Sequence, residues 1–338
     1  MGELLVLSRK EIEEILDMEM AIKAVESAYR QKSLGKGSLF PLVTHVFEEG
    51  KADMDIKSGH LSESGLFGFK VVSWFDENTQ KALPKLFGTM MVFDDATGEP
   101  LALLNAGPIT AMRTGAAGAV GAKYLANEEA GTMLMMGTGA QAAYQIAALL
   151  TVKPEIRRVF LASPHGPERA RERAAEIQGE VERLLRGKKR DYRLLLVEDL
   201  EQAVRESEIL VTATISREPL IQKEWVMPGM HFSCIGADME GKQEIDGRIL
   251  GCASVFVDDR KQAETVGECE VPIKQGLLAP EDFKGEIGEV IAGMIPGRTA
   301  KEEITVFDSS GIGLQDLTLA GELVDYAKKN GKGRWITL

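Results

Sequence analysis

The sequence predicts an α/β protein in which a doubly wound parallel sheet of the Rossmann type is inserted into a second, α+β domain. An apolar run, TMLMM, stops at Gly137 and leads through a glycine turn into the helical stretch YQIAALL. Short apolar runs then alternate with helical segments, which is typical of a parallel sheet covered on both faces. The chain before this region has a different texture, with longer strand-like segments that predict a separate domain.

The N-terminal part predicts two helices followed by strands. Ser8 and Glu11 have the form of a capping box, and Asp17 is placed to cap a second helix. That helix carries small and apolar residues at helical spacing, namely Ala21, Ala24, Val25, Ala28 and Tyr29, before Gly35 and Gly37 end it. Four strand-like segments follow: VTHVF, MDIKSGHL, FGFKVVSWF and GTMMVFDD. ALLNA comes after them and leads into the next segment.

The segment from Thr110 to Ala126 predicts a glycine-rich helix. Gly115, Gly118 and Gly121 recur every three residues. Glycine lowers helix propensity but lets another backbone approach closely, so this helix face is expected to pack tightly against something.

The spacing G-x-G-x-x-A at the glycine turn indicates a dinucleotide. Gly137 permits the turn, Gly139 lets the backbone approach a pyrophosphate, and Ala142 lets helix and strand pack closely. The start of the helix offers N–H groups to phosphates, and Thr138, Ala140 and Gln141 are expected beside them. Such turns also occur without a ligand. The alternating strands that follow favour a dinucleotide-binding domain over a ligand-free one.

The remaining elements complete this domain. A charged amphipathic helix is predicted over 167–185. Strands are predicted over 157–163, 193–199, 208–214, 231–237, 253–259 and 303–310. The helical tail LQDLTLAGELVDYAKK is expected to return to the first domain. We therefore expect a substrate-binding and dimerisation domain at 1–119 plus 313–338, and a dinucleotide-binding domain at 120–312.

The end of the second strand of such a domain usually carries an acid that binds the ribose 2′-hydroxyl of NAD. This chain has no acid there and offers Ser163, His165 and Arg169, which suit a 2′-phosphate. NADP(H) is therefore the expected cofactor, with NAD(H) as the alternative. The same residues are also typical of a turn cap and a solvated helix.

Composition excludes several classes of function. The chain has 338 residues, 44% of them hydrophobic, and a net charge of −12, which argues against nucleic acid and anionic membranes as partners. There is no basic leader before Leu4 and no apolar run of membrane-spanning length, so we expect a cytoplasmic protein. The cysteines, Cys234, Cys252 and Cys269, and the histidines have no ligand spacing, and no metal is expected.

Six blocks of sequence, in order along nearly the whole chain, resemble the ornithine cyclodeaminase and mu-crystallin family. They are FGFKVVSW, TAMRTGAAGAVGAKYLA, MGTGAQA, IGADMEGKQEID, GEIGEVIAG and VFDSSGIGLQDL. The resemblance implies a Rossmann domain inserted into a domain that dimerises through its sheet, and NAD(P)-dependent chemistry on L-amino acids or cyclic imines. Members include ornithine cyclodeaminases, alanine and arginine dehydrogenases, ketimine and pyrroline-carboxylate reductases, and mu-crystallin-type binding proteins.

Three residues are candidates for the chemistry. Hydride transfer at the α-carbon of an amino acid requires a fixed carboxylate, for which lysine and arginine are natural partners. We expect Arg113 in the first turn of the glycine-rich helix, and Lys70 lies among apolar residues. The resemblance implies that both bind the substrate carboxylate. It assigns proton transfer to Asp238, at the carboxyl edge of the sheet and hence also beside the cofactor. The structural alternatives are a salt bridge for Arg113, an exposed sheet position for Lys70 and a turn cap for Asp238.

The chain departs from the family where many members carry a further cation after a proline. Here Pro41 is followed by Leu42. Lys57, in MDIKSGHL, is a candidate replacement for that cation, and exposure to solvent is the alternative. Lys242 and Glu244 are expected only to support Asp238.

Further cofactor contacts are expected at the ends of later strands. Thr214, Ile215 and Ser216 should lie near the nicotinamide ribose. Asp308, Ser309 and Gly311 begin a segment that resembles the family's nicotinamide-side loop. The leading interpretation is an NAD(P)H-dependent reductase or dehydrogenase of a small amino or imino acid. Ornithine cyclodeaminase and a mu-crystallin-like binding protein remain as alternatives.

Overall fold

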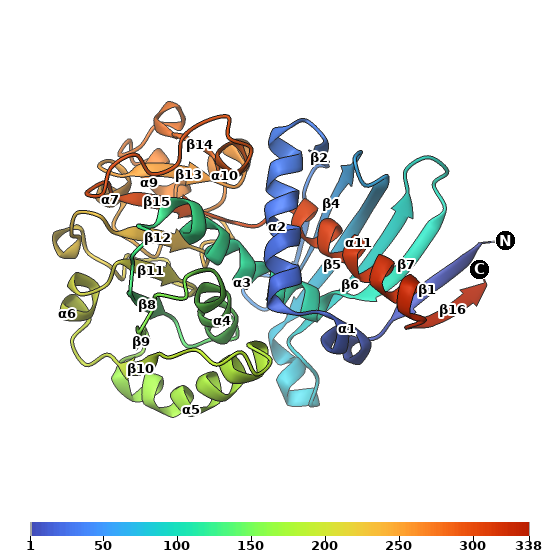
Figure 1. The fold of residues 1–338 in the computed structure, drawn as a ribbon, viewed down its shortest axis with the longest axis horizontal. Helices are drawn as coiled ribbons and strands as arrows, with labels where there is room; N and C mark the ends of the chain where they lie inside the picture. The colour runs from blue at the N-terminus through green and yellow to red at the C-terminus, as the bar shows by residue number, and fades with distance from the viewer. Residues whose placement is uncertain (1, 338) are drawn as a thin grey trace. The chain divides into compact units, whose positions relative to one another are not determined.

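The computed structural model describes residues 2–337, and the chain divides into two compact units. One unit comprises Met1–Arg113 with Ile312–Leu338, and the other comprises Thr114–Gly311. Each unit contains its own eight-stranded sheet, which we call sheet A and sheet B, respectively (Figure 1). None of the helices in the described part of the chain is long and apolar enough to cross a membrane.

Sheet A is almost entirely antiparallel. Its order is β16-β1-β7-β6-β5-β4-β2, with β3 also paired to β4, and the pair β1–β7 is parallel. The four predicted strands are present as β3 to β6, whereas β1, β2, β7 and β16 were not predicted. The bounds are β1 (Glu3–Leu7), β2 (Gly37–Leu39), β3 (Val43–Glu48), β4 (Ala52–Leu61), β5 (Leu66–Phe75), β6 (Leu86–Asp94), β7 (Pro100–Asn105) and β16 (Arg334–Thr337).

Helices from both ends of the chain pack in the first unit. The predicted caps are present: Ser8 and Glu11 form a capping box at α1 (Arg9–Ile15), and Asp17 accepts the Met20 N–H at α2 (Met18–Ser33). The C-terminal helix α11 (Gly313–Asn330) packs against α2, β4 and β5. Figure 1 shows α2 and α11 on the same face of sheet A. The expectation that the tail returns to the first domain is therefore confirmed. A 3₁₀ turn, η1 (Asp76–Lys81), joins β5 to β6.

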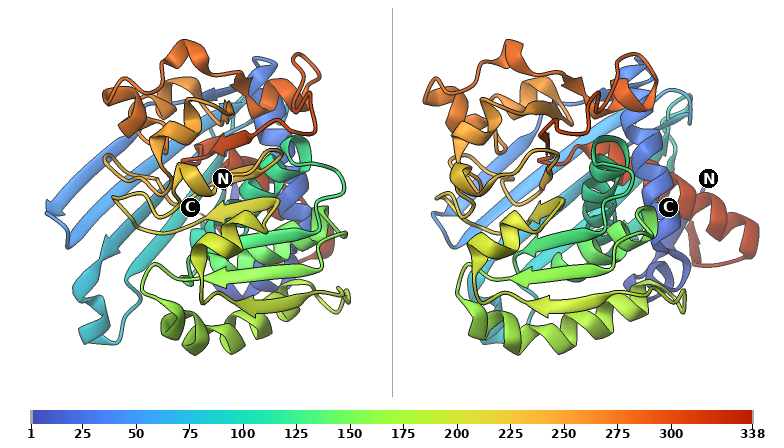
Figure 2. Two further views of the ribbon diagram at one scale, coloured as in Figure 1. Left: turned by 90° about the vertical axis from the view of Figure 1, so that its left-hand side faces the viewer. Right: turned by 60° about the vertical axis from the view of Figure 1, so that its left-hand side comes forward.

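Sheet B is parallel throughout and has the order β10-β9-β8-β11-β12-β15-β13-β14. Its first five strands follow the doubly wound order 3-2-1-4-5, so the predicted fold class is confirmed. Figure 2 shows these strands from two further directions. The bounds are β8 (Thr132–Met136), β9 (Arg158–Ala162), β10 (Arg193–Leu196), β11 (Ile209–Thr212), β12 (His231–Cys234), β13 (Ser254–Val257), β14 (Gly285–Glu286) and β15 (Thr305–Asp308).

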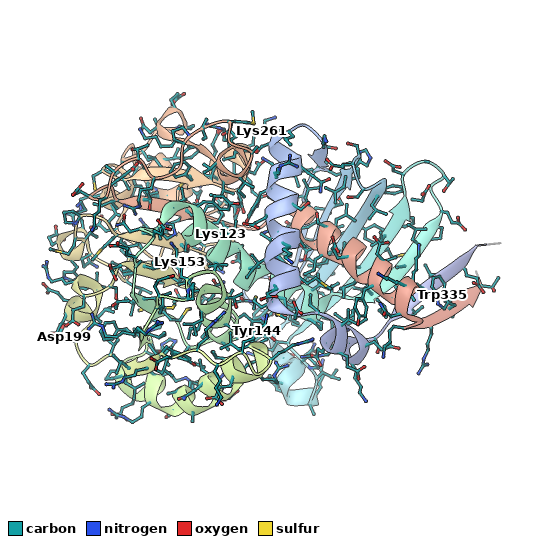
Figure 3. All side chains as sticks on the ribbon, in the orientation of Figure 1. Lys123, Tyr144, Lys153, Asp199, Lys261 and Trp335 are labelled. Carbon is teal, nitrogen blue, oxygen red and sulfur yellow. The ribbon has the colours of Figure 1, made fainter. Side chains whose placement is uncertain are left out.

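Helices connect the strands of sheet B. Asp199, labelled in Figure 3, caps one of them by accepting the Gln202 N–H. The bounds are α4 (Ala142–Val152), α5 (Pro167–Leu184), α6 (Leu200–Arg205), η2 (Lys223–Trp225), α7 (Gly247–Leu250), α8 (Arg260–Ala263), α9 (Glu270–Lys274), η3 (Pro280–Asp282) and α10 (Ile287–Ile291).

The glycine-rich helix α3 (Ala106–Leu125) packs as tightly as its sequence predicts. A Cβ on Gly115 would lie 2.7 Å from the Tyr144 carbonyl oxygen of α4. A Cβ on Gly121 would lie 2.3 Å from the Phe307 ring on β15. The lost helix propensity thus permits close approach of both α4 and β15.

Candidate functional site

Lys70, on β5, forms a buried ion pair with a residue near the start of α11. Its ammonium donates to Asp316 Oδ1 at 2.8 Å and to Thr110 Oγ1 at 3.2 Å. Lys70 is only 2% exposed and Asp316 is fully buried. The alternative of an exposed sheet lysine is therefore excluded. An ammonium among apolar residues is costly unless paired, and Asp316 supplies that pairing.

Arg113 shares the same carboxylate, but its position on α3 differs from the expectation. The helix begins at Ala106, directly after β7, so Arg113 lies in its third turn and not in the first. The N-terminal dipole effect, which acts only within the first turn, is therefore not available to it. Arg113 Nε lies 3.4 Å from Asp316 Oδ1, and its Nη1 donates to Gln315 Oε1 at 3.3 Å.

Lys57 adds a third cation to this group. It lies directly opposite Lys70 in the β4–β5 register and is half-buried. Burial lowers the pKa of Lys70 to about 7; the Asp316 carboxylate opposes this shift, and the charges of Arg113 and Lys57 add to it. Burial alone would raise the pKa of Asp316, but Lys70 and Arg113 hold it below its usual value. Like charges on directly opposite strand residues repel. The group is therefore an electropositive site suited to an added anion.

The sequence analysis did not single out Asp316, which lies in the block VFDSSGIGLQDL. The signal was the one charged residue in the helical stretch 313–321, close to Leu314 and Leu317, where an unpaired buried carboxylate would be costly. A buried lysine and a buried acid each need a partner of opposite charge, but the sequence alone does not show that these two residues contact each other. Gln315 is also involved, since it donates to the buried Tyr29 hydroxyl at 2.8 Å.

In the second unit, the residues predicted to bind the cofactor follow β9, β8, β11, β12 and β15. These are consecutive strands of sheet B, and all of them are parallel. Their carboxyl ends therefore share one edge of the sheet, where doubly wound folds bind ligands.

The glycine turn after β8 has the geometry a dinucleotide requires. Gly137 has φ +121°, and a Cβ there would lie 2.5 Å from the Ala213 carbonyl oxygen. Beside Gly139, by contrast, a Cβ would meet no atom within 4 Å. Thr138 is 8% exposed, Ala140 follows Gly139, and Gln141 precedes the first residue of α4. Among the described residues, none donates a hydrogen bond to the buried Gln141 Oε1. Open space at Gly139 and this acceptor fit a bound dinucleotide.

The residues expected at the adenosine ribose are at the surface. Ser163 Oγ accepts the His165 N–H at 3.2 Å, so Ser163 also caps its turn. His165 is exposed, and Arg169 pairs with Glu172 one turn later at 2.9 Å. Arg173, which the sequence did not single out, lies closer to the glycine turn, with Nε 3.4 Å from the Thr138 carbonyl oxygen.

Asp238 lies in the turn after β12, at the carboxyl edge of sheet B. Its side chain is 55% exposed and pairs with Lys242, which is almost buried. Both partners belong to the G-A-D-x-x-G-K-Q block. The supporting contact expected of Lys242 is therefore present. An exposed carboxylate at this edge is available for proton transfer.

Buried carboxylates hold the loops at the same edge. Glu244 accepts the backbone N–H groups of Thr214 and Gly236, at 2.6 and 2.9 Å. Asp258 accepts from Ser309 Oγ at 3.0 Å and from the Gly311 N–H at 2.7 Å. The expected cofactor residues Thr214, Ile215 and Ser216, and Ser309 with Gly311, thus lie in loops fixed by acids.

Asp308 is a further buried acid at the end of β15. Burial, together with the neighbouring Asp258 carboxylate, raises its pKa to about 7. Within residues 2–337, no group of three or more His, Cys, Asp or Glu residues is arranged to hold a metal ion.

Residues 3–331 match the sequence model of the ornithine cyclodeaminase/mu-crystallin family. The chain belongs to that family. Its similar relatives include an alanine dehydrogenase from Archaeoglobus fulgidus, 38% identical over 98% of this chain and 97% of the relative. An iminosuccinate reductase from Paracoccus denitrificans is 33% identical over 97% of this chain and 98% of the relative.

Solved structures of family members show the same fold. An archaeal alanine dehydrogenase dimer with bound NAD has a TM-score of 0.89 at 38% identity, with complete coverage of both chains. The Paracoccus denitrificans iminosuccinate reductase in complex with NAD+ has a TM-score of 0.90 at 31% identity, also with complete coverage. A Thermococcus litoralis pyrroline-carboxylate reductase with NADH and L-proline has a TM-score of 0.88 at 29% identity, over 98% of this chain and 99% of that one.

Proposed function

We propose that this protein is a nicotinamide-dependent reductase or dehydrogenase of a small L-amino acid or its imine, including cyclic imines. The observation that carries this proposal is the buried group in which Lys70 and Arg113 share one carboxylate, Asp316, with Lys57 opposite Lys70 in the register of β4 and β5. Cations exceed acids there, so a substrate carboxylate completes the charge balance. The named reductases and dehydrogenases among its relatives support the same reaction class.

A bound nicotinamide dinucleotide would supply the hydride to the substrate α-carbon in reduction, or accept it in oxidation. Arg113 binds and orients the substrate carboxylate. Lys70, whose pKa lies near 7, donates a proton to the substrate or receives one from it at neutral pH. Asp238 exchanges a proton with the substrate nitrogen, and its exposed position lets it re-equilibrate with water.

We assign the cofactor to the carboxyl edge of sheet B. Gly137, Gly139 and the start of α4 hold the pyrophosphate. Thr214, Ile215, Ser216, Ser309 and Gly311 hold the nicotinamide half. The turn directly after β9, residues 163–167, has no acid, and the Arg169 side chain is 51% exposed, so a 2′-phosphate is accommodated there. We therefore propose NADP(H) as the preferred cofactor. Comparing the dissociation constants of NADPH and NADH tests this, and an equal or higher affinity for NADH contradicts it.

We assign to Lys57 a share in substrate carboxylate binding, in place of a cation at Leu42. Leu42 is 47% exposed and has no charge to contribute. Lys57→Met should raise the Michaelis constant of the substrate while leaving the cofactor constant unchanged. An unchanged substrate Michaelis constant excludes this role.

We propose a homodimer formed through sheet A. Large apolar side chains are exposed on β3 and at the start of β6, namely Val43, Val46, Phe47, Leu86 and Phe87. Phe47 packs against Phe75, with ring centroids 5.6 Å apart. Exposed apolar groups of this kind mark interaction surfaces. Light scattering should give twice the chain mass, and Phe47→Lys should shift the population toward the monomer.

One assay series separates the three candidate functions. NADPH absorbance is followed with cyclic ketimines and with pyruvate plus ammonia, and ammonia release is measured from ornithine with catalytic NAD. Net NADPH oxidation supports the reductase. Ammonia release without net redox change identifies a cyclodeaminase, and tight cofactor binding without turnover identifies a binding protein.

A further inference from the structure

One buried carboxylate joins the loops that follow two neighbouring strands of sheet B. Glu244 Oε1 accepts the Thr214 N–H after β11, and its Oε2 accepts the Gly236 N–H after β12. Glu244 is fully buried. Hydrogen bonds from N–H groups to a charged acceptor are stronger than neutral ones. One side chain therefore joins these two loops directly, alongside the backbone bond from the Gln243 N–H to the Ser216 carbonyl oxygen at 3.1 Å.

The backbones joined in this way are in close contact. A Cβ on Gly236 would lie 2.4 Å from both the backbone nitrogen and the carbonyl oxygen of Thr214. On the other side, a Cβ on Gly137 would lie 2.5 Å from the Ala213 carbonyl oxygen. The glycine turn, the loop after β11 and the loop after β12 therefore pack side by side, and a shift of one displaces its neighbour.

Glu244 is itself held by a second buried acid. Glu268 Oε1 accepts the N–H groups of Glu244 and Ile245, at 2.9 and 2.7 Å. The Glu244 carbonyl oxygen accepts the Leu220 N–H at 2.8 Å, which ties it to the end of the loop after β11. Burial raises the pKa of both Glu244 and Glu268, so keeping two acids here is costly. That cost is offset by the backbone groups that they order.

We propose that Glu244 is a positioning residue for the nicotinamide half of the cofactor. It fixes the loop that carries Thr214, Ile215 and Ser216 against the turn that leads to Asp238, and so sets where the nicotinamide ribose and ring are received. Ile215 is 80% exposed at the tip of this loop, as expected for an apolar side chain that a flat ligand covers. The inference rests on the proposed dinucleotide function and adds a residue that touches neither cofactor nor substrate.

The variant Glu244→Gln tests this assignment. Glutamine has only one acceptor oxygen, which can accept from one of the two backbone N–H groups. Its amide nitrogen, itself a donor, would face the other N–H group, so that hydrogen bond is lost and two donors repel each other. The dissociation constant for NADPH should rise about tenfold or more. The dissociation constant for ADP-ribose, which lacks the nicotinamide, should stay within about twofold of the wild type.

Glu208→Gln is the matched control. Glu208, an exposed residue just before β11, carries the same change from carboxylate to amide away from the proposed cofactor site; its Oε2 accepts the N–H groups of Gly131 and Thr132 at 2.8 and 3.1 Å. It lies at the amino ends of β8 and β11, the opposite edge of the same sheet. This variant should bind both ligands as the wild type does.

Each outcome decides a separate point. Wild-type affinity of Glu244→Gln for NADPH overturns the inference, and so does an equal loss for NADPH and ADP-ribose, which indicates a general structural effect. If Glu244→Gln does not fold, Glu244→Asp, one methylene shorter, replaces it under the same criteria. If the wild type binds neither NADPH nor NADH, the proposed function fails. Hydrogen exchange of the Thr214 and Gly236 backbone amides then tests the positioning role. That role requires faster exchange in Glu244→Gln than in the wild type.

Discussion

Lys70 Nζ lies 2.8 Å from Asp316 Oδ1, across 246 positions of sequence, and both side chains are buried. The pair joins β5 to α11 inside the first unit. Arg113 and Lys57 act on the same carboxylate, so Asp316 balances only part of the positive charge. Removing a cation is therefore expected to alter substrate binding or turnover, and thermal melts of each variant measure the accompanying cost of leaving the buried Asp316 less compensated.

Lys70→Met should lower kcat/KM by about 10²- to 10⁴-fold, the usual contribution of a positioned proton donor. Lys153→Met is the control. Lys153, labelled in Figure 3, follows the last residue of α4 and is also a buried lysine, and its ammonium donates to the Asn127 carbonyl oxygen. That control should keep wild-type kinetics. Steady-state assays of both purified variants decide, and unchanged kcat/KM in Lys70→Met removes Lys70 from the reaction.

The dependence of kcat/KM on pH should follow the ionisation of Lys70. Because the pKa of Lys70 lies at about 7, the ammonium predominates below pH 7 and is lost above it. kcat/KM for imine reduction, which consumes a proton, should therefore fall as pH rises through about 7. Amino acid oxidation should show the opposite trend. Lys70→Arg stays charged in this pH range, so the fall of kcat/KM above pH 7 should disappear in this variant. If the variant has the same pH profile as the wild type, the fall is due to another group.

Gly139→Ala should separate folding from cofactor binding. A Cβ at Gly139 meets no atom within 4 Å, so the melting temperature should match that of the wild type. The added methyl group would occupy the space assigned to the pyrophosphate, and the dissociation constant for NADPH should rise about tenfold or more. Isothermal titration and thermal melts measure the two effects. Wild-type affinity would place the pyrophosphate elsewhere.

Two glycine substitutions in helices should have opposite effects on stability. Gly121→Ala brings a Cβ to 2.3 Å from the Phe307 ring, and this overpacking should cost about 1–3 kcal/mol. Gly179→Ala, in α5, has open space and should stabilise the fold by about 0.5–1 kcal/mol. Urea unfolding gives both values. Equal effects of the two variants would contradict the tight packing of α3.

Much of the fold could be predicted because its signals are local. Alternation and apolar runs identified the strands β3 to β6, β8 to β13 and β15, and the caps at Ser8 and Asp17 depend on residues three positions apart. The strand β2 has only three residues, too few to show a pattern. β1 and β16 are as long as several strands of sheet B, but they lie near the chain ends, outside the alternating series of strands and helices that identified those strands. The start of α3 was placed four residues too late, at Thr110 and not Ala106, because Gly107 and Pro108 read as a turn although the first helical turn tolerates them.

By itself, the sequence determined the fold class and the glycine turn, because both depend on patterns along short segments, and its resemblance to the family supplied the candidates Lys70, Arg113, Lys57 and Asp238. Only the tertiary structure decided that Asp316 joins the cations and that Glu244 bridges Thr214 and Gly236. Those partners come from distant segments, and a pairing between buried charges depends on which elements pack together. The local sequence does not specify which elements pack together.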